Sequence, residues 1–214
     1  MSVSEERTVQ PSPTPPAPAP AVADPAPLGL AGFAATTFLL SASNAGWMTG
    51  ATTLAWLGYA FAYGGHGQLL AGMWEFRNRN VFGATAFSTY GAFWIGLGLW
   101  FRLVALPELT AKTATGAMID HDIGWILLAF AIFNTYMLIL STQVNMAVFL
   151  VFLTLELTEI ILFIGNFSVS SGTVKFGGYV GVLTALCAWY TSAAGVSNGV
   201  AGKLRFPVGK PLIR

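Results

Sequence analysis

Long apolar stretches separated by short polar segments dominate the chain. Each stretch approaches or exceeds the roughly 17–25 residues that an α-helix needs to cross about 30 Å of hydrocarbon. Apolar and polar residues do not alternate, as they would in the strands of a membrane β-barrel. The pattern therefore predicts six transmembrane helices, at Asp24–Ser43, Trp47–Trp74, Val81–Ala105, Asp122–Leu140, Met146–Phe167 and Phe176–Val200.

Polar segments separate these stretches, at 41–46, 77–80, 107–122, 141–145 and 168–175. Most are too short to fold as domains, so we expect one six-helix bundle over residues 24–202. Residues 1–23 are rich in proline and alanine, which favours a solvated, disordered tail. Residues 203–214 form a short basic tail. The start, "MSVSEERTVQ", is acidic with no apolar core directly behind it, unlike a secretory signal peptide.

The composition also indicates an all-α integral membrane protein. Of the 214 residues, 55% are hydrophobic and 9% are charged, whereas a soluble domain carries about a quarter charged residues. A net charge of +1, with no basic run interleaved with aromatic residues, gives no reason to expect a nucleic-acid partner. A single cysteine, Cys187, excludes an intramolecular disulfide. We expect no metal, no cofactor and no enzymatic activity, because no metal-ligand or nucleophile–base set stands out.

The basic residues predict the orientation of the chain. Six spans place both termini on one side, and with that side cytoplasmic seven basic residues lie inside and three outside. This distribution satisfies the positive-inside rule, so we expect a multi-pass plasma-membrane protein with cytoplasmic termini. The inside set is Arg7, Arg77, Arg79, Lys203, Arg205, Lys210 and Arg214, and the outside set is Arg102, Lys112 and Lys175.

The stretch "DPAPLGLAGF" joins the tail to the first span. Asp24 is a good helix N-cap, and Pro25 suits the first helical position, where its missing N–H would have no partner anyway. Gly29 and Gly32 lie on one helix face, so something approaches that face closely. Either another helix or a small solute would meet this requirement.

This stretch resembles the "NPAPLGL" signature of the acetate uptake transporter family, also called the succinate–acetate permease family. The similarity continues through "GFAATTFLLS", "YGGHGQLLAGMWEFRNRNVFGATAFSTYGAFW" and "FIGNF". Asp24 stands where the family usually has Asn, which adds a negative charge near an anion pathway. The resemblance implies six-helix subunits assembled as hexamers. Each subunit would contain its own path for acetate and related small carboxylates such as succinate, either channel-like or proton-coupled.

The resemblance also implies an apolar constriction formed by Phe33, Tyr90 and Leu155. Two rings and a branched side chain can block hydrated ions and still pass a methyl-bearing acid, and the phenol keeps one hydroxyl for the carboxylate. Ala188 matches a position where side-chain size tunes which acids pass. Without the family motifs, core packing would be the plainer interpretation of the aromatic residues.

A carboxylate that crosses a bilayer must lose its water, which is costly unless a positive charge, hydrogen-bond donors or a proton compensates. The middle of the predicted spans contains no Lys or Arg, so donors and helix N-termini are expected to line the path. Side chains with such donors are plentiful in and next to the spans, namely those of Thr36, Thr37, Asn44, Tyr63, Gln68, Thr85, Ser88, Thr89, Tyr90, Asn134 and Asn166. The candidates for substrate contact are Pro27, Leu28, Gly29, Thr36, Asn44, Gln68, Ser88 and Asn166.

Two carboxyl groups, those of Glu156 and Glu159, lie inside the fifth predicted span. Ionisable residues at membrane depth are candidates for function. Leu155 and Glu159 share a helix face, so Glu159 faces the pore if Leu155 does. Either glutamate can carry a proton beside acetate or donate a hydrogen bond to it. A bond across a helix or subunit interface is the alternative for both.

Two other functions fit parts of the pattern. A channel for neutral solutes, such as urea or short amides, would equally lack a ring of basic residues. A membrane scaffold or sensor without transport would rely on its proline-rich tail for binding. The family motifs favour transport of small carboxylates through a neutral, hydrogen-bonding pore.

Overall fold

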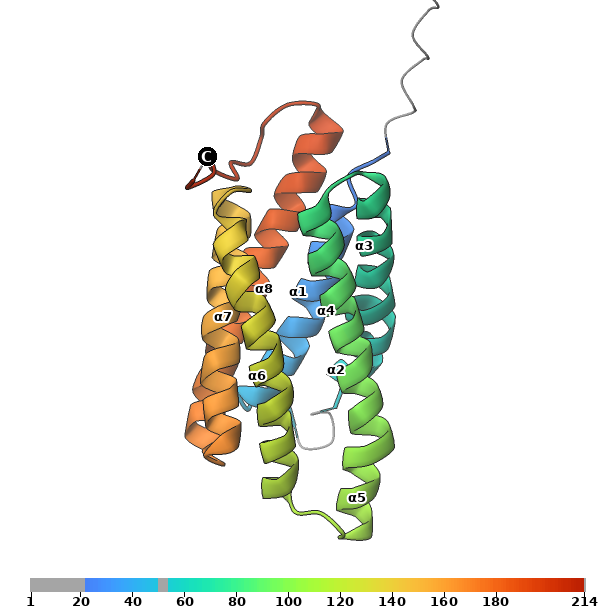
Figure 1. The fold of residues 1–214 in the computed structure, drawn as a ribbon, viewed down its shortest axis with the longest axis vertical. Coiled ribbons are helices and arrows are strands. Elements are labelled where there is room, and N and C mark those ends of the chain that lie inside the picture. Colours follow the sequence, from blue (N-terminus) through green and yellow to red (C-terminus); the bar gives the residue numbers. More distant parts are fainter. Residues whose placement is uncertain (1–21, 50–53, 214) are drawn as a thin grey trace, which may run out of the picture.

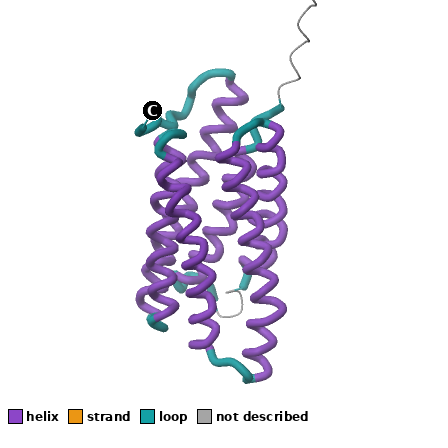
Figure 2. The backbone as a smooth tube through the Cα atoms, viewed as in Figure 1, coloured by secondary structure: helices purple, strands orange, loops and turns teal. Residues whose placement is uncertain are grey.

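The computed structural model describes residues 22–49 and 54–213, which contain helices and no strands. Figures 1 and 2 show the long helices running side by side as one elongated bundle. The helices are α1 (Ala26–Asn44), α2 (Trp56–Phe61), the π-helical segment η1 (Ala62–Gly67), α3 (Gln68–Arg77), α4 (Val81–Trp100), the π-helical segment η2 (Phe101–Ala105), α5 (Leu106–Ala111), α6 (Gly116–Ser141), α7 (Met146–Phe167) and α8 (Ser171–Ala201).

Five helical runs among the described residues are long and apolar enough to cross a membrane. They are Ala26–Asn44, Val81–Ala111, Gly116–Ser141, Met146–Phe167 and Ser171–Ala201. The remaining predicted span, Trp47–Trp74, is described in part, because residues 50–53 lie outside the described residues. Its described part contains α2, η1 and most of α3 in unbroken succession. Of the predicted tail, residues 1–21 also lie outside the described residues.

Several helices are longer than the apolar stretches that predicted them. The loop predicted at 107–122 is wrong for most of its length, because α5 continues α4 through η2 and α6 begins at Gly116. Thr115 caps α6 by accepting a hydrogen bond from the Met118 amide at 3.3 Å. Likewise α8 begins at Ser171, not Phe176. The backbone hydrogen bonds of a helix can continue into polar residues. Hydropathy indicates only the part of the helix that is apolar enough to lie in hydrocarbon.

The start of α1 differs by one residue from the prediction. Pro25, not Asp24, is the N-cap, and its carbonyl accepts the amides of Leu28 and Gly29 at 3.1 and 3.2 Å. The Asp24 carboxylate instead accepts the Ala26 amide at 2.9 Å. Asp24 therefore forms a local turn that leads into the helix.

Protein atoms pack against both glycines of the predicted close-contact face on α1. A Cβ at Gly29 would lie 2.7 Å from the Phe87 ring of α4, and one at Gly32 would lie 2.7 Å from the Tyr63 carbonyl of η1. Gly64 of η1 packs in turn on Thr36. Of the two alternatives that the sequence left open, neighbouring helices therefore account for this face.

After α8 the chain folds back over the end of the bundle. The Val208 carbonyl accepts the Ala147 amide of α7 at 2.9 Å, and the Thr142 carbonyl accepts the Leu212 amide at 2.8 Å. Residues 208–213 are thus held against the turn between α6 and α7, where they supply backbone partners to the two helix ends.

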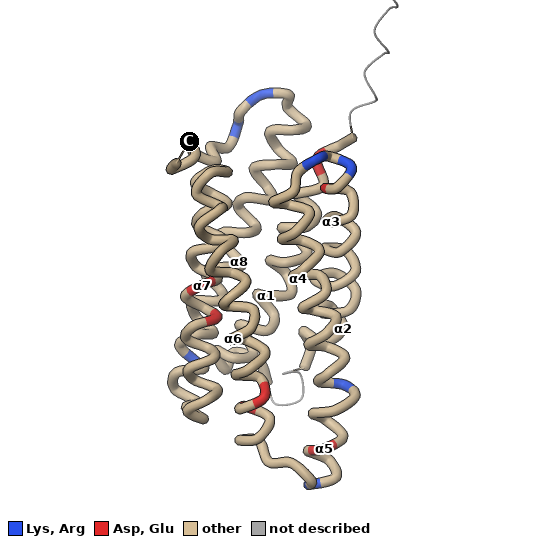
Figure 3. The backbone as a smooth tube through the Cα atoms, viewed as in Figure 1, with Lys and Arg blue, Asp and Glu red and all other residues tan. Residues whose placement is uncertain are grey.

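Basic residues gather at the two ends of the bundle (Figure 3). The end of α3, the turn between α3 and α4 and the segment after α8 all lie at the end that carries the C-terminus (Figure 3). These segments hold the described members of the predicted inside set, which are Arg77, Arg79, Lys203, Arg205 and Lys210. The α5 helix and the start of α8 lie toward the opposite end; Arg102 lies in η2 just before α5, Lys112 directly follows α5, and Lys175 lies in the first turns of α8. Arg7 and Arg214 lie outside the described residues. The fold therefore separates the two predicted charge sets along its long axis.

Candidate functional site

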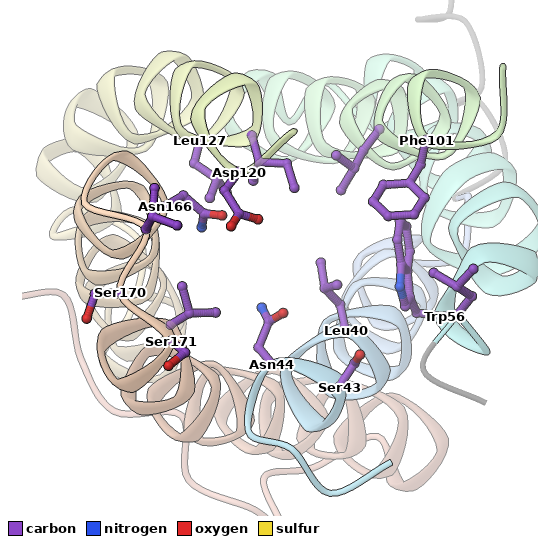
Figure 4. A pocket seen from close by; sticks show the side chains of 15 residues that line it. Leu40, Ser43, Asn44, Trp56, Phe101, Asp120, Leu127, Asn166, Ser170 and Ser171 are labelled. Atoms are coloured by element: carbon purple, nitrogen blue, oxygen red, sulfur yellow. The ribbon is translucent and has the colours of Figure 1, made fainter. Parts of the chain in front are cut away.

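Two large cavities open at opposite ends of the bundle. The upper vestibule, at the upper end in Figure 1, has a volume of about 500 Å³ and is lined by residues from α1, α3, α4, α7 and α8, among them Pro27, Glu75 and Phe152. The lower vestibule also has a volume of about 500 Å³. Figure 4 shows Asn44 and Asp120 directed into the space that the helices of the lower vestibule surround.

A small cavity of about 40 Å³ lies between the two vestibules. It shares Leu40 and Leu127 with the lower vestibule. Its lining also includes Phe33, Tyr90 and Leu155, the three predicted constriction residues. Such a volume holds no more than a few water molecules, so of these three cavities the one at the constriction residues has by far the least free space.

The constriction residues continue the lining of the upper vestibule along the same helices. Leu30, Phe87 and Phe152 line that vestibule, each one turn before a constriction residue on α1, α4 or α7. Residues one turn apart share a helix face. The three helix faces therefore run from the upper vestibule, through the constriction, toward the lower one.

The constriction is tightly packed. The rings of Phe33 and Tyr90 meet edge to face, with centroids 5.7 Å apart and an interplanar angle of 65°. Phe33, Tyr90 and Leu155 are 4%, 3% and 6% exposed. The Tyr90 hydroxyl donates a hydrogen bond to Asn134 Oδ1 at 2.9 Å. This bond and the ring contact together hold the tyrosine in one orientation.

Three residues that line the small cavity carry buried polar atoms without a hydrogen-bond partner. These atoms are Thr37 Oγ1, Trp94 Nε1 and Glu159 Oε2. Buried polar groups in proteins are nearly always paired, and each exception calls for an explanation. A carboxylate ligand would supply acceptors for the Thr37 hydroxyl and the Trp94 indole N–H. These two donors suit a small carboxylate that has lost its water, and Glu159 could donate to it only with its carboxyl group protonated.

Trp94 was not predicted as a site residue. An apolar indole in a hydrophobic span looks like core, and the residue is indeed only 3% exposed. Its position four residues after Tyr90 places it on the same face of α4, which was the available signal. Leu155 and Glu159, which share a face by the same spacing, both line the small cavity.

Three other predicted contact residues line the vestibules, and a fourth lies in a groove nearby. Pro27 lines the upper vestibule. Leu28 lies beside it in a separate, open groove between α1 and α8. Asn44 and Asn166 line the lower vestibule.

The remaining candidates line none of these cavities. The Thr36 hydroxyl donates to the Tyr59 carbonyl at 3.3 Å, and Gly29 packs against Phe87. Ser88 packs against Gly72 of α3, and Gln68 is 1% exposed. Ala188 is fully buried in the apolar core that contains the constriction residues. Glu156 accepts hydrogen bonds from α6 instead.

The amino-acid sequence matches the sequence model of the GPR1/FUN34/yaaH family over residues 6–210. The chain belongs to this family. The match confirms the resemblance to acetate uptake transporters, because acetate permease A of Emericella nidulans is 39% identical over 199 residues, covering 87% of this chain and 65% of the relative. The chain therefore spans less than two thirds of that relative's length.

Shorter members of the family match over nearly their whole length. The succinate-acetate/proton symporter SatP of Escherichia coli is 32% identical over 189 residues, which cover 88% of this chain and 96% of SatP. The solved structure of the bacterial acetate channel SatP superimposes with a TM-score of 0.78 at 31% identity, and covers 88% of this chain and 100% of that one. With its apolar helices, this family member is a multi-pass membrane protein.

Proposed function

We propose that this protein carries acetate and related small carboxylates, succinate among them, across a membrane through a passage inside each subunit. The observation that carries the proposal is the apolar constriction between two vestibules, with unpartnered polar atoms on Thr37, Trp94 and Glu159 beside it. The names of the relatives, a permease, a symporter and a channel for acetate, support the same substrate class.

The chemistry of the passage suits a dehydrated carboxylate. The small cavity is lined without Lys or Arg, so donors must replace the lost water of an anion. The Thr37 hydroxyl and the Trp94 indole N–H would bind the carboxylate oxygens, and the rings of Phe33 and Tyr90 would contact the methyl group. Neutral donors bind the anion without trapping it as strongly as a buried cation would.

The assembly that we propose has six membrane spans per subunit. The helical run Trp56–Arg77 serves as the sixth span, because its length suits about 30 Å of hydrocarbon. We further propose a hexamer in the plasma membrane with both termini cytoplasmic. The larger number of basic residues at the C-terminal end supports this orientation.

Uptake into liposomes that contain the purified protein tests the function. We expect uptake of labelled acetate above that of protein-free liposomes, with competition from unlabelled acetate and succinate and none from urea. Uptake of urea with exclusion of acetate would replace the proposal with a neutral-solute channel. If neither acetate nor urea is taken up, a scaffold or sensor without transport is favoured. Deletion of residues 1–23 would then abolish binding to its partner.

We propose that Glu159, not Glu156, binds a proton during transport. Glu159 is 3% exposed and lines the small cavity beside Tyr90, whereas the Glu156 oxygens are both occupied by α6 donors. Glu159→Gln is expected to retain acetate uptake but to lose its acceleration by an inward proton gradient. Glu156→Gln is the matched control and should keep that acceleration. Equal responses of both variants to the gradient would remove Glu159 from this role.

Asp24 is expected to slow the entry of anions. It lines the upper vestibule together with Glu75 and stands where the family usually has Asn. Asp24→Asn should raise the initial rate of acetate uptake by about twofold at low ionic strength and by less in 0.5 M salt, because salt screens an exposed charge. Glu108→Gln removes the same charge from a residue that lines neither vestibule and should leave the rate unchanged. A salt-independent gain would point to a cause other than charge.

A further inference from the structure

A chain of hydrogen bonds connects the constriction to the far side of the α6–α7 pair. It begins at the Tyr90 hydroxyl, which donates to Asn134 Oδ1 at 2.9 Å. Asn134 Nδ2 donates to Glu156 Oε2 at 2.7 Å. Glu156 Oε1 accepts the Thr135 hydroxyl at 2.7 Å. Asn134 is fully buried, Glu156 is partly buried and Thr135 is exposed, so the chain of bonds runs outward from the passage.

The acceptors around Asn134 fix the direction in which its amide points. Its two N–H groups are both used, one by Glu156 and the other by the Phe152 carbonyl at 3.0 Å. A carbonyl and a carboxylate accept but do not donate. The amide oxygen must therefore face Tyr90. The Tyr90 hydroxyl can also hydrogen-bond the Glu159 carboxyl group, so the Asn134 oxygen decides which of two acceptors the hydroxyl uses.

We propose that Glu156 is a positioning residue, which orients the constriction tyrosine Tyr90 through Asn134 and thereby sets the width of the passage. The proposal rests on the proposed function of the constriction as a transport path. Glu156 never touches the substrate, and it acts as a hydrogen-bond acceptor. Its charge is not required, because the Asn134 amide needs only an oxygen at that place.

Two substitutions of Glu156 distinguish its role as a hydrogen-bond acceptor from any role of its negative charge. In Glu156→Gln, the amide oxygen still accepts from Asn134, and the new N–H group can donate to Thr135, whose own hydroxyl can donate to the Ala131 carbonyl at 2.9 Å. In Glu156→Leu, one buried N–H of Asn134 loses its acceptor. The amide can then rotate away from Tyr90, and the hydroxyl turns to its other acceptor, the Glu159 carboxyl group.

The transport test compares the ratio of acetate uptake to uptake of the bulkier lactate. Loss of one buried hydrogen bond changes a rate or an equilibrium constant by about tenfold. We therefore expect Glu156→Leu to lower the ratio of acetate to lactate uptake by about fivefold to tenfold. Glu156→Gln should restore the wild-type ratio. In a Tyr90→Phe background, Glu156→Leu should have no further effect. Leu157→Ala, an exposed change on the same helix, controls for altered packing of the outer face.

A spectroscopic test does not depend on transport. With 3-fluorotyrosine placed at position 90 alone, the ¹⁹F resonance should shift and broaden in Glu156→Leu and remain at the wild-type position in Glu156→Gln. Identical spectra in all three proteins would overturn the proposal, as would equal shifts in both variants. If wild-type protein carries no acetate but the spectra behave as expected, the proposed function fails while the positioning role of Glu156 stands.

Discussion

Replacement of Leu155 by tryptophan is expected to abolish acetate uptake. The substitution places an indole beside Phe33 and Tyr90, where the free volume is about 40 Å³. The larger ring fills the narrowest part of the passage, and any rearrangement that admits acetate must displace packed aromatic side chains. A barrier raised by about 3 kcal/mol slows uptake about a hundredfold. Initial rates of labelled acetate uptake into liposomes measure the effect.

Two companion variants identify the cause. Leu155→Ala should widen the passage and increase the uptake of lactate relative to acetate. Leu157→Trp adds the same indole to an exposed position of α7, 47% accessible, and should leave uptake within about twofold of wild type, because surface changes have small effects. If Leu155→Trp transports at the wild-type rate, the passage does not run between Phe33, Tyr90 and Leu155.

Replacement of Gly178 by leucine is expected to prevent folding of the bundle. Gly178 of α8 packs directly on α1, and a Cβ there would lie 2.5 Å from the Ala45 amide nitrogen and 2.8 Å from the Ser41 carbonyl oxygen. Backbone atoms cannot move aside as a side-chain tip can, so α1 and α8 would have to separate. We expect the free energy of unfolding to fall by more than about 3 kcal/mol. Little folded protein would then be recovered after extraction, and its thermal midpoint would be lower.

Gly172 provides the matched control on the same helix. A Cβ at Gly172 would have no atom within 4 Å among the described residues. Gly172→Leu should therefore leave the thermal midpoint of the purified protein unchanged or slightly raised, since leucine is the better helix former. Equal losses in both variants would show that glycine itself, rather than close helix contact, is needed in α8.

Hydropathy predicted the helices well because burial in hydrocarbon requires long apolar runs with internally satisfied backbones. It predicted the helix ends less well. Polar residues at 107–111 and 116–121 mark where the chain leaves the apolar region, yet the backbone remains helical through most of them. The family motifs led to Phe33, Tyr90 and Leu155, which no periodicity would have selected.

Inward-facing polar residues were harder to predict. Apolar side chains surround these helices on all sides, so amphipathic periodicity does not mark the inner face. Thr36 and Thr37 are neighbours in the sequence, but Thr37 lines the small cavity and Thr36 bonds to the Tyr59 carbonyl. Gln68 is buried and Ser88 is half-buried, yet neither lines any of the three central cavities. Whether a polar side chain faces a cavity depends on how its helix is rotated about its own axis. Packing against the neighbouring helices sets that rotation.

The sequence by itself determined that the chain is helical, membrane-embedded and a member of an acetate transporter family, because length, hydropathy and motif are local properties of the chain. Only the tertiary structure decided that Phe33, Tyr90 and Leu155 meet between two vestibules, that Trp94 and Thr37 lie beside them, and that Glu156 reaches Tyr90 through Asn134. These contacts join residues far apart in the chain, and close packing between helices brings them together.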